Sequence, residues 1–126
     1  MKAPGTAYND PLIGRDPQPA HMKNFVKTQS DNGGVHINSG IPNKAFYEVA
    51  IALGGKAWDK AGKIWYRTLM DKIQPLTTFA ECAAMTVEVA GVLYGQGSTE
   101  QKAVRAGWTV VGIPVGGSLV KAAGAN

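Results

Sequence analysis

Four successive segments between residues 39 and 113 repeat apolar residues at every third or fourth position, and this spacing restricts the fold more than any other feature. A strand would show strict alternation instead, because its successive side chains point to opposite faces. Glycine or proline stands at or shortly after the end of each segment, as is usual where helices stop. The sequence therefore predicts a mainly α-helical fold, an orthogonal bundle of about four to five helices.

The first two predicted helices are amphipathic. One begins after Asn38 or Ser39, either of which could cap its first turn, and ends at the glycine pair 54–55. The second begins near residue 58 or 59 and runs to residue 73, ahead of Pro75. The apolar residues expected to be buried are Ile41, Ala45, Phe46, Val49, Ala50 and Leu53 in the first helix, and Ala61, Ile64, Trp65, Thr68 and Leu69 in the second.

Two further predicted helices complete the bundle. The third lies within residues 78–95 and is apolar around much of its circumference, as the central helix of a small bundle would be. The fourth follows a capping and acidic sequence, STEQ, and runs from residue 99 or 100 to about residue 111. The side of the fourth helix that we expect to be buried contains Val104, Trp108 and Val111.

The N-terminal part of the chain is organised differently. Up to about residue 34 it is dense in proline, glycine, asparagine and aspartate, which force the backbone out of helical geometry. We expect extended chain and turns there, with one short helical turn around residues 20–26. The expected organisation is a single domain over 1–126, with an irregular arm that includes the His36 loop over 1–38, a helical bundle over 39–113 and a tail over 114–126.

Charge and composition argue against several classes of protein. The net charge is +4, and the basic residues are scattered without the concentrated stripe that nucleic-acid binding requires. No uncharged apolar run reaches the ~18 residues of a membrane span, and the N-terminus lacks the apolar run of a signal peptide. Cys82, the single cysteine, is expected to be a small buried side chain.

One of the two histidines stands in a segment suited to chemistry. His21 is interpreted as a loop residue, and neither histidine belongs to the H-E-x-x-H spacing of a zinc-binding helix. Asp31 precedes His36 by five residues across a Gly-Gly turn, so its carboxylate can reach one ring nitrogen and leave the other free. Such a pair favours the protonated ring, which could stabilise a developing oxyanion. The alternative is an ordinary turn aspartate beside a packed histidine.

The residues around this pair closely match a known family. DNGGVHINSGIPNKAFY, residues 31–47, resembles the signature of the thermolysin family of zinc metallopeptidases, in which this loop opens the first helix of the C-terminal domain. The likeness continues through GKIWYRTL, TFAECAAMTVEVAGVLYG and EQKAVRAGWTVVGI, and DPQPAHM is similar to the bacterial branch. The resemblance covers roughly residues 1–113 and implies the helical C-terminal domain of such a peptidase.

The resemblance also implies roles for both residues of the pair. His36 matches the histidine described as the proton donor that hydrogen-bonds the tetrahedral intermediate, and Asp31 matches the aspartate that orients it. The family's zinc ligands, two histidines of H-E-x-x-H and a glutamate, lie N-terminal to this region, and its substrate-binding arginine falls just before residue 1. The implied parent is a secreted zinc endopeptidase. Its zinc-binding N-terminal domain and a peptide or protein substrate are the implied partners, and this chain alone is expected to be inactive.

Metals and rival functions complete the expectations. Zinc is expected only in the parent, with no metal ligand and no cofactor in this chain. Asp10 and Asp16 are interpreted as turn formers rather than calcium ligands, although the resemblance allows calcium in the parent. The separated domain is expected to self-associate through its exposed cleft face. A rival hypothesis is a free-standing helical protein-binding module derived from this fold, against which the retained Asp31 and His36 argue.

Overall fold

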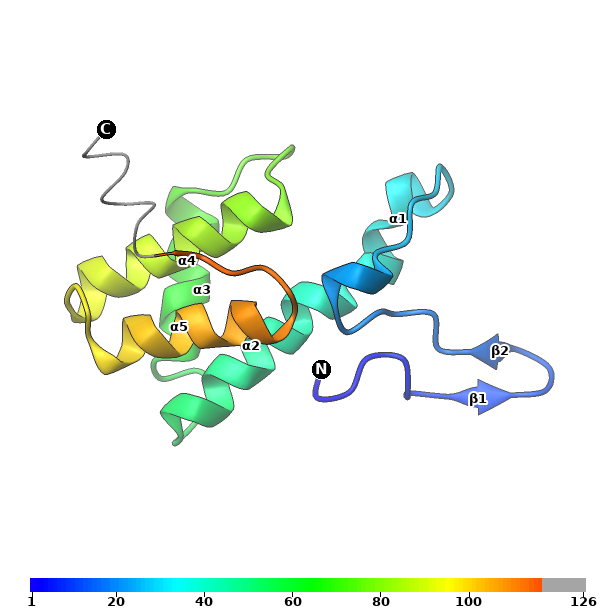
Figure 1. The fold of residues 1–126 in the computed structure, drawn as a ribbon, viewed down its shortest axis with the longest axis horizontal. Helices are drawn as coiled ribbons and strands as arrows, with labels where there is room; N and C mark the ends of the chain where they lie inside the picture. Colours follow the sequence, from blue (N-terminus) through cyan, green and yellow to red (C-terminus); the bar gives the residue numbers. More distant parts are fainter. Residues whose placement is uncertain (117–126) are drawn as a thin grey trace.

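The structure is a computed structural model that describes residues 1–116. Its elements, in chain order, are β1 (Asn9–Asp10), β2 (Gly14–Arg15), η1 (Met22–Asn24), α1 (Asp31–Asn38), α2 (Gly40–Leu53), α3 (Ala61–Asp71), α4 (Phe79–Tyr94) and α5 (Thr99–Val110). Figure 1 shows α2 to α5 gathered into a bundle, while α1 and the antiparallel β1–β2 hairpin extend to one side. The expected mainly helical fold with an irregular N-terminal arm is confirmed. Residues 117–126 of the predicted tail lie outside the described residues.

The predicted boundaries of three helices are close to those observed, and the second predicted helix differs. It begins at Ala61 rather than at residue 58 or 59, and it ends at Asp71 rather than at residue 73. The residues before it form a turn instead, closed by a hydrogen bond of 2.7 Å from the Gly62 N–H to the Ala57 carbonyl. Trp58 consequently lies outside the helix with 69% of its surface exposed. Within residues 1–116, every helix is too short or too polar to span a bilayer.

Side chains cap the first turns of α4 and α5. Thr78 Oγ1 accepts from the Glu81 N–H at 3.1 Å, and the Glu81 carboxylate accepts from the Thr78 N–H at 2.8 Å, which is a reciprocal capping box. Ser98 Oγ accepts from the Gln101 N–H at 3.1 Å at the start of α5. The Gln101 side chain turns inward and donates to the carbonyl of Val87 on α4 at 3.0 Å. The predicted cap of α5 is therefore present, and its glutamine joins two helices.

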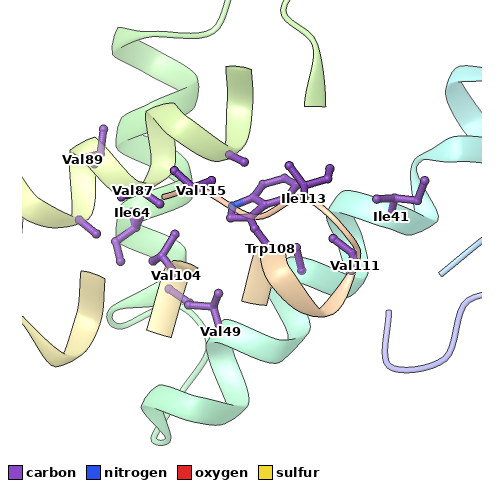
Figure 2. Packing of buried hydrophobic residues seen from close by; sticks show 14 residues of the cluster. Ile41, Val49, Ile64, Val87, Val89, Val104, Trp108, Val111, Ile113 and Val115 are labelled. Carbon is purple, nitrogen blue, oxygen red and sulfur yellow. The ribbon is translucent and has the colours of Figure 1, made fainter. Parts of the chain in front are cut away.

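The core lies between α2, α3, α4 and α5, with Trp108 at its centre (Figure 2). Trp108 is fully buried, and its indole Nε1 donates to Thr86 Oγ1 at 2.8 Å. α2 and α5 approach closely at Gly107, where an added Cβ would stand 2.5 Å from Val49 Cγ2. The predicted core residues of α2 and α5 that are fully buried are Ile41, Ala45, Val49, Val104, Trp108 and Val111.

The α3 side of the bundle is covered less completely. Trp65 on α3 stacks on Trp108 with ring centroids 6.0 Å apart, and it meets Phe46 edge-on at 5.2 Å. Leu69 was predicted to face the core, but it is 60% exposed, so that prediction is wrong. The reason is that the buried stripe of α3 is narrow and ends at Thr68.

Aspartates organise the N-terminal arm. The Asp16 carboxylate accepts hydrogen bonds from the backbone N–H groups of Gln18, Ala7 and Gly5 at 3.1, 3.1 and 2.9 Å. These bonds lower the pKa of Asp16. Asp10 Oδ1 accepts from the Leu12 N–H at 2.7 Å within the hairpin turn. Both side chains act as the turn formers that the sequence predicted.

The arm also reaches the end of the bundle. The Met22 N–H donates to the Val111 carbonyl, just beyond α5, at 2.8 Å. The neighbouring His21 caps η1 by accepting from the Lys23 N–H at 3.1 Å, and its ring lies against Gly112. His21 therefore serves the structure, in agreement with its interpretation as a loop residue, and η1 lies within the predicted short helical turn.

Candidate functional site

The loop that carries Asp31 and His36 has an unusual backbone. Asp31, Asn32, Gly33 and Gly34 have φ values of 54°, 50°, 84° and 81°, so four successive residues are in the left-handed region. Glycine adopts this region freely, and aspartate and asparagine tolerate it better than other residues. The segment was predicted as an irregular turn, and it instead forms the kinked first half of α1, which becomes right-handed after Gly34.

The left-handed turn brings the Asp31 carboxylate onto His36 and its neighbour. Asp31 Oδ1 lies 2.7 Å from His36 Nδ1, which is the side-chain contact that the sequence predicted. Asp31 Oδ2 accepts from the backbone N–H groups of His36 and Ile37 at 2.8 and 3.0 Å. Because the His36 ring and these N–H groups stabilise the anion, the pKa of Asp31 is lowered from its ordinary value.

The two members of the pair differ in exposure. The Asp31 side chain is 23% exposed, whereas the His36 side chain is 84% exposed. A carboxylate at Nδ1 requires that this nitrogen carry a proton, since an anionic oxygen can only accept. Among the described residues, no protein group bonds the other ring nitrogen, Nε2. His36 therefore has one nitrogen fixed by Asp31, while most of its side chain is exposed.

Buried contacts hold this loop against the arm. Asn38 is 2% exposed, and its amide makes two bonds of 2.9 Å, accepting from the Val26 N–H and donating to the Val26 carbonyl. Gln18 Nε2 donates to the carbonyl of His36 at 3.0 Å. A Cβ at Gly34 would stand 2.9 Å from the Asn38 amide nitrogen, so only glycine fits there. These bonds fix the backbone of the loop against the arm.

Two expectations about the start of α2 need correction. Asn38 does not cap the helix, because its side chain is occupied by Val26. Ser39 occupies the N-cap position, but its hydroxyl donates to the carbonyl of His36 at 2.6 Å and caps no N–H of the helix. The sequence did not predict the hydrogen bonds of Gln18 to His36 and of Asn38 to Val26. Sequence spacing does not indicate which side chain bonds a backbone group 18 or 12 residues away.

Comparison with known proteins identifies the family. The family model described as the thermolysin metallopeptidase, alpha-helical domain, matches residues 1–113. The chain belongs to this family. The chain spans about a third of the length of two curated relatives and about a fifth of the length of others, including a thermolysin.

Three of these relatives are highly similar. Protease PrtS of Photorhabdus sp. is 55% identical to this chain. The match covers 91% of this chain and 31% of that protein. An extracellular metalloprotease of Pectobacterium carotovorum is 52% identical over 91% of this chain and 33% of its own length. The solved precursor of protealysin, a metalloproteinase from Serratia proteamaculans, is 55% identical, with a TM-score of 0.82 over 89% of this chain and 34% of that one.

The thermolysin family implies zinc, and the residues described here do not form a zinc site. Within residues 1–116, no three histidine, cysteine, aspartate or glutamate side chains gather to hold a metal ion. Cys82 is half-buried, and burial raises the pKa of its thiol, which suits a packed side chain better than a ligand. The described residues therefore bring Asp31 and His36 together without a third such side chain beside them.

We expect Asn38→Ala to destabilise the chain by about 1–3 kcal/mol, because it removes a buried amide and leaves the part-buried N–H and carbonyl of Val26 without partners. Urea unfolding of the variant against the original chain measures this difference. Asn24→Ala is the matched control, because Asn24 is exposed and should change the free energy of unfolding by less than about 0.5 kcal/mol. Equal effects of the two substitutions would contradict the role of Asn38.

The lowered pKa of Asp31 predicts a pH-dependent contribution to stability. Because the folded-state pKa lies below the unfolded one, Asp31 stabilises the fold above its unfolded pKa and loses this effect as pH falls through the folded pKa. The stability difference between the original chain and Asp31→Asn should therefore shrink as the pH falls through and below the ordinary range of an aspartate pKa. Urea unfolding at several pH values tests this, and a difference that stays constant over this range would refute it.

Proposed function

We propose that this chain is the C-terminal domain of a zinc endopeptidase that hydrolyses peptide bonds. It supplies His36 as the group that stabilises the tetrahedral intermediate and Asp31 as the residue that orients His36. The observation that carries this proposal is the Asp31–His36 contact of 2.7 Å, combined with an imidazole that is 84% exposed. A histidine held in this way is fixed in direction yet open to a ligand outside the domain.

The chemistry proposed for the pair follows from its geometry. When both ring nitrogens carry protons, Nδ1 donates to Asp31 and Nε2 can donate to a negatively charged oxygen of a bound substrate. Asp31 stays ionised because its pKa is lowered, and its bonds to two backbone N–H groups keep the carboxylate from turning away. Zinc, when bound by the other domain, supplies the Lewis acid for the scissile carbonyl.

The partner and the location are part of the same proposal. The N-terminal zinc-binding domain of the parent is the partner, and a peptide or protein substrate binds between the two, since clefts between domains commonly hold substrates. Relatives bear the names extracellular metalloprotease and extracellular elastase, which supports a secreted parent. Calcium in the parent stays a prediction of the family resemblance.

The test compares the 126-residue chain with the full-length protein. After dialysis against zinc, the full-length protein should hold about one zinc ion and cleave a peptide substrate, and a chelator should abolish the cleavage. The 126-residue chain should hold no stoichiometric zinc and cleave nothing. One tightly bound zinc ion per 126-residue chain, or peptide cleavage by that chain alone, would overturn the proposal.

A further inference from the structure

An apolar groove lies between α2, α3 and α4, and it does not include Asp31 or His36. Its volume is about 450 Å³. The residues that form most of its wall are Phe46, Trp65, Tyr66, Leu69, Ile73 and Cys82. Phe46 and Trp65 continue directly into the core, because Trp65 stacks on Trp108. The groove is therefore an uncovered part of the hydrophobic core rather than a shallow surface dent.

Helix α3 borders the groove with large apolar side chains. Tyr66, Leu69 and Met70 are 65%, 60% and 63% exposed. Soluble monomers seldom expose apolar residues together in this way unless another surface covers them. This explains why the sequence predicted Leu69 to be buried, since its apolar character suits an interior position that the described residues do not provide.

The charges on the same helices do not favour a charged occupant. Arg67 pairs with Asp71 along α3, and Lys44 pairs with Glu48 along α2 at 2.8 Å. No Asp, Glu, Lys or Arg side chain is among the described residues that form the wall of the groove. An apolar polypeptide segment fits such a wall better than an anionic or cationic ligand.

The start of the chain lies at this groove. Met1 is part of its wall, and the Lys44 ammonium on α2 donates to the carbonyl of Lys2 at 2.7 Å, which holds the chain there. The chain matches the helical domain of the family and spans a third or less of the length of its relatives. In the full-length protein, the polypeptide on the N-terminal side of this domain therefore reaches the domain beside the groove.

We propose that the α3 groove receives the segment of the full-length protein that immediately precedes residue 1, and that this contact fixes the helical domain to the other half. The inference rests on the proposed function for the existence of that half. It adds that the surface joining the two halves is separate from the part of this domain that carries His36. Association and chemistry then depend on different residues.

The experiment introduces a charged side chain. Such a side chain changes the stability of the protein little at an exposed position and lowers it at a covered one. Leu69→Glu is made both in the 126-residue chain and in the full-length protein, and thermal unfolding is followed for each. Ile51→Glu is the control, because Ile51 is 62% exposed on α2, is also helical, and lies outside the groove. Leu69→Glu should lower the Tm of the full-length protein by about 5 °C or more and that of the 126-residue chain by less than about 2 °C. Ile51→Glu should shift neither by more than about 2 °C.

Each contrary outcome has a definite meaning. If Leu69→Glu shifts both proteins equally, or neither, or if Ile51→Glu shifts the full-length protein as much, the proposal is wrong. Sedimentation of the 126-residue chain provides a second measurement. If Leu69→Glu dissociates a dimer of that chain and leaves the Tm of the full-length protein unchanged, a second copy covers the groove, and the proposal is again wrong.

The result is separable from the proposed function. Zinc content and peptide cleavage are measured on the same full-length preparations. A full-length protein without zinc or activity would refute the proposed function, while the difference in Tm between its variants would still decide whether the groove is covered.

Discussion

Replacing His36 with alanine in the full-length protein should lower the turnover rate roughly 100-fold to 1000-fold while leaving zinc content and folding nearly unchanged. Loss of one hydrogen-bond donor to a developing oxyanion typically costs about 3 to 4 kcal/mol of transition-state stabilisation. Folding should be almost unaffected, because the His36 side chain is 84% exposed. Steady-state kinetics and metal analysis on the same preparations measure both quantities. A His36→Ala protein that loses its zinc, or that keeps full turnover, would contradict the role assigned to His36.

The partner substitution Asp31→Asn should lose as much activity as His36→Ala or less. The asparagine can still accept a hydrogen bond from Nδ1, but it no longer places a negative charge against the ring. The double variant should be far from additive, since Asp31 acts only through His36 in the proposed mechanism. Kinetics of the original protein, the two single variants and the double variant test this. Additive losses would indicate that the two residues act separately.

The second large effect concerns stability. Trp108→Ala should destabilise the chain by about 3–5 kcal/mol, because it empties the centre of the core. It also removes the hydrogen bond to Thr86 and the stack on Trp65. A small domain has only about 5–15 kcal/mol of stability in total, so the variant should be largely unfolded on mild heating.

An exposed tryptophan offers the matched control for this prediction. Trp58 is 69% exposed, and the Lys56 ammonium lies over its ring, 5.2 Å from the ring centroid. Trp58→Ala should therefore cost no more than about 1 kcal/mol. Urea unfolding followed by circular dichroism compares the two variants without relying on tryptophan fluorescence. Similar losses for both would show that Trp108 is not the centre of the core.

Much of the fold could be predicted from the sequence because helices depend on local signals. The spacing of Val104, Trp108 and Val111 indicates one face of a helix, and all three are fully buried. The same local reasoning placed Asp31 within reach of His36, since two glycines between them allow the turn. Both successes concern residues only a few positions apart.

The remaining features depend on parts of the protein that are distant in sequence. Asn38 looked like a helix cap, but its amide is bound by Val26 on the arm. Leu69 looked like a core residue, but nothing among residues 1–116 covers it. In both cases the local pattern was sound, and the outcome was decided by a surface that spacing along the chain does not reveal.

The bond between Met22 and Val111 has a consequence for the order of events during synthesis. These residues are separated by most of the chain, so the arm cannot settle onto the end of α5 until Val111 has left the ribosome. The bundle depends on the same late segment, because α2 packs against α5 at Gly107. The arm is therefore made first, but its bond to the end of the bundle forms last. The bonds that hold His36 and its loop, made by Asp31, Gln18 and Val26, join residues at most 18 positions apart, so they can form before Val111 has emerged.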